Sequence, residues 1–171
     1  VHLVTLVLLL TTFAIPSTSG RAALALPVFL ALATVLSERP RLVLTLSLVF
    51  PAVILCSAVG SLLGAGAHLI TSEIVRTTTG SGIGFLQWMI LGLPLAIVWS
   101  HLAAEIALSL FTDRAERRRP LSVTRDVFGG SAGPLTAPQK RVLAVLVAVV
   151  TLWCTEPVHG IEPAIDSGFT E

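Results

Sequence analysis

The chain has 171 residues; 54% of them are hydrophobic, only 12% are charged, and the net charge is +1. Soluble domains carry about 25% charged residues, so this composition excludes an ordinary soluble domain and predicts an all-α integral membrane protein. Seven of the eleven Lys and Arg residues lie between positions 113 and 141, a pattern typical of a cytoplasmic loop rather than of a nucleic-acid site.

Residues 1–36 form two apolar arms, 1–15 and 22–36, around a short polar segment. Each arm has 15 residues, so as a helix it would reach about 22 Å, less than the roughly 30 Å of a bilayer core. We therefore expect a re-entrant helical hairpin whose tip lies near the middle of the membrane. The polar side chains of this tip are those of Ser17, Thr18, Ser19 and Arg21.

Three hydroxyls and a guanidinium at a membrane-embedded tip favour an anion-binding site. Non-helical backbone at that depth is tolerated only when it is buried in protein or lines a wet cavity. A guanidinium binds carboxylate or sulfate oxygens through paired hydrogen bonds. Two simpler interpretations stay open: the hydroxyls could serve only as a helix cap and turn, and Arg21 could face the cytoplasmic mouth or a buried Glu.

Residues 37–76 predict a broken transmembrane helix. A polar turn with an Arg on each side of Pro40 indicates the cytoplasmic side. Three glycines then fall within seven positions, at 60, 64 and 66, and each weakens a helix by about 1 kcal/mol relative to Ala. We expect the helix to unwind there and to resume over 69–75, as discontinuous helices do at the ion sites of transporters. Close helix packing through the spaced glycines is the alternative.

Residues 77–111 predict a polar loop followed by a continuous transmembrane helix over 85–111. Trp88 lies near the outer end of that helix, where an interfacial aromatic is expected. His101 and Glu105 have the four-residue spacing of metal ligands on a helix. No third ligand accompanies them, so packing or a hydrogen bond is the favoured interpretation and we expect no metal.

A few polar and sulfur-containing side chains outside the hairpin have simple interpretations. Glu73 and Arg76 are three residues apart and should pair at the outer interface. His68 is either a proton carrier or a packing histidine, the second being the simpler interpretation. Cys56 and Cys154 stand in apolar surroundings and are expected to act as small hydrophobic residues.

The remaining residues divide into a linker and a final apolar segment. Residues 112–141 predict a basic cytoplasmic linker, and residues 142–171 predict the start of the next transmembrane helix with a truncated tail. The chain begins with Val and stops soon after an apolar run. We interpret it as a fragment of a longer multi-pass protein of the plasma or inner membrane.

Four stretches, taken in order, resemble the divalent anion:sodium symporter family, also called solute carrier family 13. The hydroxyl tip stands nine residues before Pro27, where the family carries a Ser-Asn-Thr signature. The other three stretches are the glycine-rich run 60–70, the helix start 85–94, and the segment 135–160, which looks like the linker and the opening of a second inverted half.

The resemblance implies a re-entrant helical hairpin with broken and continuous transmembrane helices, as part of an inverted-repeat transporter that forms a homodimer. It places the signature on Ser17, Thr18 and Ser19, with a hydroxyl in place of the middle amide. The implied substrate site is Ser17, Thr18, Ser19 and Arg21. The implied sodium site uses backbone and hydroxyl groups of Ser17, Thr18, Gly60, Ser61 and Gly64. No cofactor is implied beyond Na⁺ as the coupling ion.

The expected function is therefore secondary active transport of a divalent or carboxylate anion, or of sulfate, coupled to a cation. Half-helix N-termini and hydroxyls would replace the water that the anion loses. A transporter similar to arsenite permeases or proton antiporters is the alternative, together with a non-transporting membrane subunit. An enzyme is not expected, because no motif places a histidine base beside the tip serines.

Overall fold

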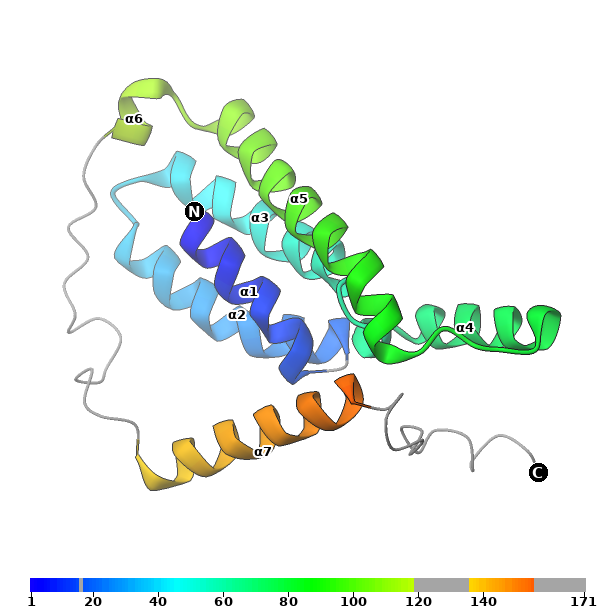
Figure 1. Cartoon of the computed structure of the whole chain (residues 1–171). Coiled ribbons are helices and arrows are strands. Elements are labelled where there is room, and N and C mark those ends of the chain that lie inside the picture. The colour runs from blue at the N-terminus through cyan, green and yellow to red at the C-terminus, as the bar shows by residue number, and fades with distance from the viewer. Residues whose placement is uncertain (16, 119–135, 156–171) are drawn as a thin grey trace.

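The computed structural model describes residues 1–15, 17–118 and 136–155 (Figure 1). Within these ranges every regular element is helical and no residue lies in a strand, which confirms the all-α class. The elements are α1 (His2–Ala14), α2 (Thr18–Val35), α3 (Pro40–Ala58), a 3-10 turn η1 (Leu62–Gly64), α4 (Gly66–Thr79), α5 (Phe85–Phe111), α6 (Arg114–Arg118) and α7 (Ala137–Cys154).

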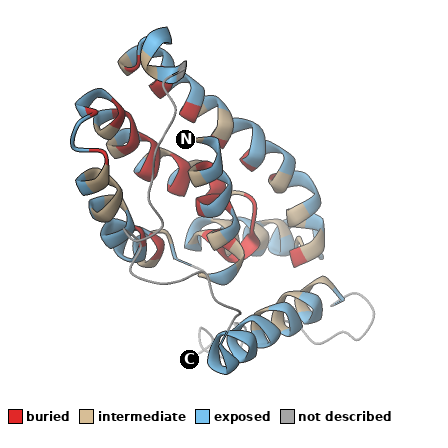
Figure 2. Cartoon of the chain, turned by 90° about the vertical axis from the view of Figure 1, so that its left-hand side faces the viewer, coloured by how far each residue is buried: buried red, intermediate tan, exposed pale blue. Residues whose placement is uncertain are grey.

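Helix α3 lies at the centre of a bundle and packs against α1, α2 and α5 (Figure 1). Its Val49 and Val53 side chains are fully buried, and Phe50 meets Phe29 of α2 edge-to-face with 5.4 Å between the ring centroids. Buried residues concentrate where these four helices meet, as Figure 2 shows in red. Burial of α3 therefore fixes the hairpin of α1 and α2 against α5.

Four of the described helices are long and apolar enough to cross a membrane: α2, α3, α5 and α7. Helix α1, with 13 residues, is shorter. Many large apolar side chains on these helices are exposed, for example those of Leu24, Leu55 and Leu91. A protein in water would not expose such surfaces, whereas lipid tails or further helices would cover them. The chain is a multi-pass membrane protein.

Helix α2 is longer than the sequence predicted. It has 18 residues rather than 15 and begins at Thr18, so Thr18, Ser19 and Arg21 belong to its first turn and not to an irregular tip. The cause is Ser17, whose hydroxyl accepts a hydrogen bond from the Gly20 amide at 3.2 Å and so caps the helix. The non-helical part of the hairpin is correspondingly shorter than expected.

Helix α4 also starts earlier and ends later than predicted, at Gly66 and Thr79. It projects sideways from the bundle and has no buried residue (Figure 1). Its end is closed by Gly80, whose φ of +84° is the left-handed conformation that favours glycine. The predicted pairing of Glu73 with Arg76 is confirmed, at 2.9 Å between Oε2 and Nε.

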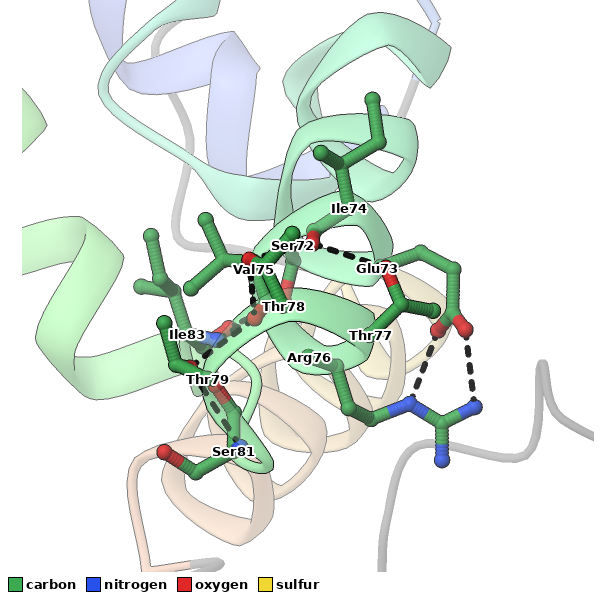
Figure 3. Close-up of polar contacts among 10 residues, drawn as sticks. All are labelled: Ser72, Glu73, Ile74, Val75, Arg76, Thr77, Thr78, Thr79, Ser81 and Ile83. Atoms are coloured by element: carbon green, nitrogen blue, oxygen red, sulfur yellow. Dashed lines mark hydrogen bonds and ion pairs between the residues drawn. The ribbon is translucent and has the colours of Figure 1, made fainter.

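The loop after α4 is held back against the helix by Ser72 (Figure 3). The Ser72 hydroxyl donates to the carbonyl oxygen of Ile83 and accepts from its amide, both at 2.9 Å. A Cβ at Gly82 would lie 3.1 Å from the same hydroxyl oxygen, so the residue there must be small. These contacts set where the chain turns before α5.

The turn before α3 and the residues after α5 meet at one end of the bundle. Arg39 forms an ion pair with Glu116 of α6, with 2.7 Å between Nε and Oε1, and Arg41 pairs with Asp113. The two segments that the charge pattern assigns to the cytoplasmic side thus lie together. Only the first pair is largely buried, since Arg39 is 8% exposed.

Helix α7 begins at Ala137, five residues before the apolar segment predicted from 142. The reason is a capping box, in which Thr136 and Gln139 satisfy each other's backbone amides, so the last residues of the predicted linker are helical. Parts of the ranges used in the sequence analysis lie outside the described part of the chain: residue 16 at the hairpin tip, residues 119–135 of the predicted linker, and residues 156–171 of the final segment.

Candidate functional site

The hairpin tip presents its hydroxyls at the N-terminus of α2. Ser17 and Ser19 are exposed and Thr18 is half-buried. Within the described residues, the hydroxyls of Thr18 and Ser19 make no hydrogen bond. A helix N-terminus carries free amides and about half a positive charge. The tip therefore offers unpaired hydrogen-bond donors at a positive helix end.

Arg21 lies in the first turn of α2 and points into the bundle rather than outward from the tip. Its side chain is only 1% exposed. Its Nη1 donates to the Ser57 hydroxyl at 2.9 Å and its Nη2 donates to the carbonyl oxygen of Ile54 at 2.7 Å. Its Nε has no hydrogen-bond partner in the part of the chain that the structure describes. No carboxylate of the described residues pairs with it, so the guanidinium is a buried charge with only neutral partners.

Ser57, in the last turn of α3, connects both arms of the hairpin to the end of that helix. Its hydroxyl accepts from Arg21 of α2, and its carbonyl oxygen accepts from the Thr12 hydroxyl of α1 at 3.2 Å. Thr12, Arg21 and Ser57 are each at most 1% exposed. The tip is thereby fixed to the point where the backbone leaves the helical conformation.

The helix break runs from Val59 to Ala65 and is buried. Ser61 and Ala65 have extended backbones, and the 3-10 turn η1 lies between them. Residues 60–64 are all buried. A Cβ at Gly64 would overlap the carbonyl oxygen of Ala58, so glycine is required for the chain to fold back on the end of α3. The break needs protein donors for its carbonyls, since buried backbone groups are costly when unpaired.

Two aromatic side chains supply those donors. The indole nitrogen of Trp88 donates to the carbonyl oxygen of Val59 at 2.9 Å. Nδ1 of His68 lies 3.0 Å from the carbonyl oxygen of Ser61, and because a carbonyl only accepts, this nitrogen carries the proton. The two rings also contact each other, with 4.8 Å between their centroids.

The role of Trp88 differs from the interfacial anchor that the sequence suggested. Its position near a helix end gave no sign of a partner 29 residues earlier in the chain. The signal that could have found it is Gly92, one turn later on α5. A Cβ there would overlap the carbonyl oxygen of Val59, so this glycine marks the close approach of α5 to the break.

Of the two expected roles for His101 and Glu105, the structure does not show the intrahelical hydrogen bond, because both side chains contact His2 instead. His2 of α1 lies between them, with 3.0 Å between the two histidine Nδ1 atoms and 2.7 Å from its Nε2 to Glu105 Oε1. No group of His, Cys, Asp or Glu in the described ranges has the geometry to hold a metal ion. The cluster joins α1 to α5 at the bundle surface.

Comparison with known proteins gives the family. A model described as the sodium:sulfate symporter transmembrane region matches residues 52–170. The chain belongs to this family. The sodium:sulfate symporter family is one of membrane transporters and not of enzymes. The match starts within α3, so it contains the helix break, Trp88 and His68, whereas the hairpin tip precedes it.

One relative is a protein described as "Membrane protein" from Cupriavidus necator. It is 32% identical over 110 residues, which make up 62% of this chain and 21% of that protein. The chain therefore spans about a fifth of the length of this relative. No solved structure shows a significant match.

Proposed function

We propose that the full-length protein is a secondary active transporter of divalent or carboxylate anions, sulfate among them, in the plasma or inner membrane. Membership of the sodium:sulfate symporter family supports anion transport with Na⁺ as the coupling ion. The observation that carries the proposal is the position of Arg21, a buried cation that no carboxylate in residues 1–15, 17–118 or 136–155 pairs with, one helical turn from a tip rich in free hydroxyls.

The charge of Arg21 explains why the bound solute should be an anion. A charge held in a low-dielectric interior is costly unless an opposite charge compensates it. Arg21 has neutral acceptors in Ser57 and Ile54, so the compensating charge has to come from elsewhere. An anion at Ser17, Thr18 and Ser19 would supply it, and the α2 N-terminus adds to the attraction.

The proposed binding geometry follows from the tip. The hydroxyls of Ser17, Thr18 and Ser19, together with free amides at the start of α2, would donate to the anion oxygens. This replaces part of the hydration that a dianion loses on leaving water. Arg21, from its position inside the bundle, would attract the anion through its positive charge and could donate a hydrogen bond from its Nε. The site is thus built for a compact oxyanion such as sulfate or a dicarboxylate.

The transport cycle and assembly that we propose come from the family and the helix pattern. α1 and α2 would form a re-entrant hairpin, α3 with α4 a broken transmembrane helix, and the segment from 142 onward the start of a second, inverted half. The linker 112–141 would face the cytoplasm, and the full-length protein would be a homodimer. Movement of the hairpin-bearing part against a scaffold would alternate access to the site.

The predicted cation ligands are Ser17, Thr18, Gly60, Ser61 and Gly64. The backbone of the break contributes carbonyl oxygens, which are the groups that hold Na⁺ at broken helices in secondary transporters. The carbonyl of Ser61, however, already accepts a hydrogen bond from His68. A sodium ion at Ser61 would therefore share this carbonyl oxygen with His68.

Uptake of labelled sulfate and succinate tests the function. The full-length protein in proteoliposomes should accumulate one of these anions under an imposed cation gradient, and the double variant Ser17→Ala/Thr18→Ala should lose most of that uptake. Thr34→Ala is the matched control, because its hydroxyl lies on the same helix and, among the residues that the structure describes, bonds only to the Leu30 carbonyl. Unchanged uptake in the double variant would remove the tip from the mechanism.

A further inference from the structure

We propose that His2 and His101, together with Glu105, form a site for a single proton that holds the first arm of the hairpin against α5. The site lies toward the end of the bundle that the charge pattern assigns to the cytoplasmic side, because Arg117 of α6 reaches Glu105 with 3.7 Å between Nη1 and Oε2. Gain or loss of protons at this site would change how firmly α1 is attached to the bundle.

The fold brings together three side chains that are far apart in the sequence. His2 is the one titratable side chain of α1, and His101 and Glu105 are the two titratable side chains of α5. All three meet where the two helices contact each other, and the histidine rings stack with 5.2 Å between their centroids. Ionisable groups on transmembrane helices are costly, so their meeting at one point favours a function beyond packing.

The hydrogen bonds determine where the protons of this cluster lie. An ionised carboxylate only accepts, so His2 Nε2, which is 2.7 Å from Glu105 Oε1, carries a proton. In a neutral His2 the Nδ1 atom is then an acceptor. It lies 3.0 Å from His101 Nδ1, so the nitrogen of His101 is the donor. This leaves Nε2 of His101 as the atom that takes up the first additional proton.

The histidine pair can take up one additional proton, but not two, and keep its contact. With one, an imidazolium at His101 donates to a neutral His2, and charged hydrogen bonds are stronger than neutral ones. With two, both Nδ1 atoms carry hydrogens and the two rings carry like charges, so the contact becomes repulsive. Falling pH should therefore first strengthen and then break the contact, within the range in which histidine titrates.

The other charged groups at this end of the bundle do not replace the histidines in this role. Glu38 of the turn before α3 and Arg114 of α6 are exposed. The remaining titratable side chains of α2 and α3, apart from Arg41, lie toward the hairpin tip. Three ion pairs without histidine complete the surroundings: Arg117 with Glu105, Arg39 with Glu116, and Arg41 with Asp113.

Helix α1 connects this proton site to the hairpin tip. His2 holds the first turn of the helix, and near its other end Thr12 donates to the carbonyl oxygen of Ser57 at 3.2 Å. A shift of α1 along α5 would consequently also move the segment that leads into the tip. Acid on the cytoplasmic side should therefore slow anion uptake, a consequence that rests on the proposed function.

Double-mutant cycles on the full-length protein in detergent test the proton site. The cycle of His2→Ala with His101→Ala measures the coupling between the two side chains and cancels the titration of distant groups. At about pH 7 the coupling should be about 2- to 10-fold in the unfolding equilibrium constant, the scale of one hydrogen bond. At about pH 5 the coupling should vanish, because both rings are then protonated.

His101→Gln is the matched variant. An amide group offers both a donor and an acceptor, so glutamine can bond to His2 in either protonation state. Its coupling to His2 should be the same at both pH values. The alanine cycle of Arg39 with Glu116, a pair without histidine, is the control and should change little. A coupling of His2 with His101 that is absent at about pH 7, or equal at both pH values, would overturn the inference.

Sulfate uptake into proteoliposomes gives a second readout, because sulfate keeps both charges over this pH range whereas succinate does not. The initial rate of the wild type should be lower with about pH 5 than with about pH 7 on the cytoplasmic side, and His101→Gln should remove the difference. The same pH dependence in both proteins would overturn the link from this site to transport. Absence of wild-type uptake at either pH would overturn the transport proposal instead, and the cycles would still decide the proton site.

Discussion

Trp88 of α5 donates a hydrogen bond from its indole nitrogen to the carbonyl oxygen of Val59, the residue that ends α3. This contact places the continuous helix α5 against the end of α3, where the broken helix is interrupted. The rings of Trp88 and His68 also contact each other beside the break, tilted by 32°. The carbonyl oxygens of the helix break consequently accept hydrogen bonds from specific side chains. Each of these contacts can be tested separately.

Trp88→Phe should destabilise the protein by about 1–3 kcal/mol, because it leaves the carbonyl of half-buried Val59 without its side-chain donor while keeping most of the aromatic packing. The measurement is the free energy of unfolding of the full-length protein in detergent. Trp99→Phe is the control, since Trp99 is 51% exposed and should change stability little. Equal effects of the two substitutions would contradict the assigned role of Trp88.

Gly92→Ala should destabilise the protein by about 1–3 kcal/mol, the usual range for overpacking a close contact. The added Cβ would overlap the Val59 carbonyl oxygen and push α5 away from the break. The matched control is Gly66→Ala, because nothing lies within 4 Å of a Cβ at that position. The same unfolding assay should show Gly66→Ala as neutral or slightly stabilising; a neutral Gly92→Ala would mean that the two helices are not in contact.

The sequence alone predicted the helical class and much of the helix pattern. The continuous span expected over 85–111 coincides with α5, and Gly60 and Gly64 lie in the break while Gly66 begins α4, because local composition determines both. The long-range contacts left no such local signal. Trp88 bonds to a residue 29 positions away and His2 to one 99 positions away, and neither spacing matches a helical period.

The candidate site was predicted in part, for a similar reason. The hydroxyl-rich segment was visible as a polar interruption between two apolar arms. Its local structure was misjudged, because one hydroxyl was enough to cap α2 and to draw Thr18 to Arg21 into the helix. That change turned Arg21 toward Ser57 and Ile54, a direction that depends on where α3 lies and that no spacing within the tip encodes.

The ion pair of Arg39 with Glu116 should couple more strongly than that of Arg41 with Asp113. The first pair is largely buried, with side chains 9% and 24% exposed, whereas those of the second are 63% and 70% exposed. Double-mutant cycles with alanine should give a coupling of about 0.5–3 kcal/mol for the buried pair. For the exposed pair we expect about 0–1 kcal/mol, reduced by salt. A larger coupling in the exposed pair would contradict this packing of α6.

The central claim is that an anion binds at the hydroxyls of the hairpin tip, and labelling of Ser19→Cys tests it most directly. In the full-length protein with Cys56 and Cys154 replaced, a membrane-impermeant maleimide should react slowly with this cysteine. Sulfate or succinate should slow the reaction further. A cysteine that reacts as fast as one in bulk water, at a rate that neither anion changes, would contradict the account.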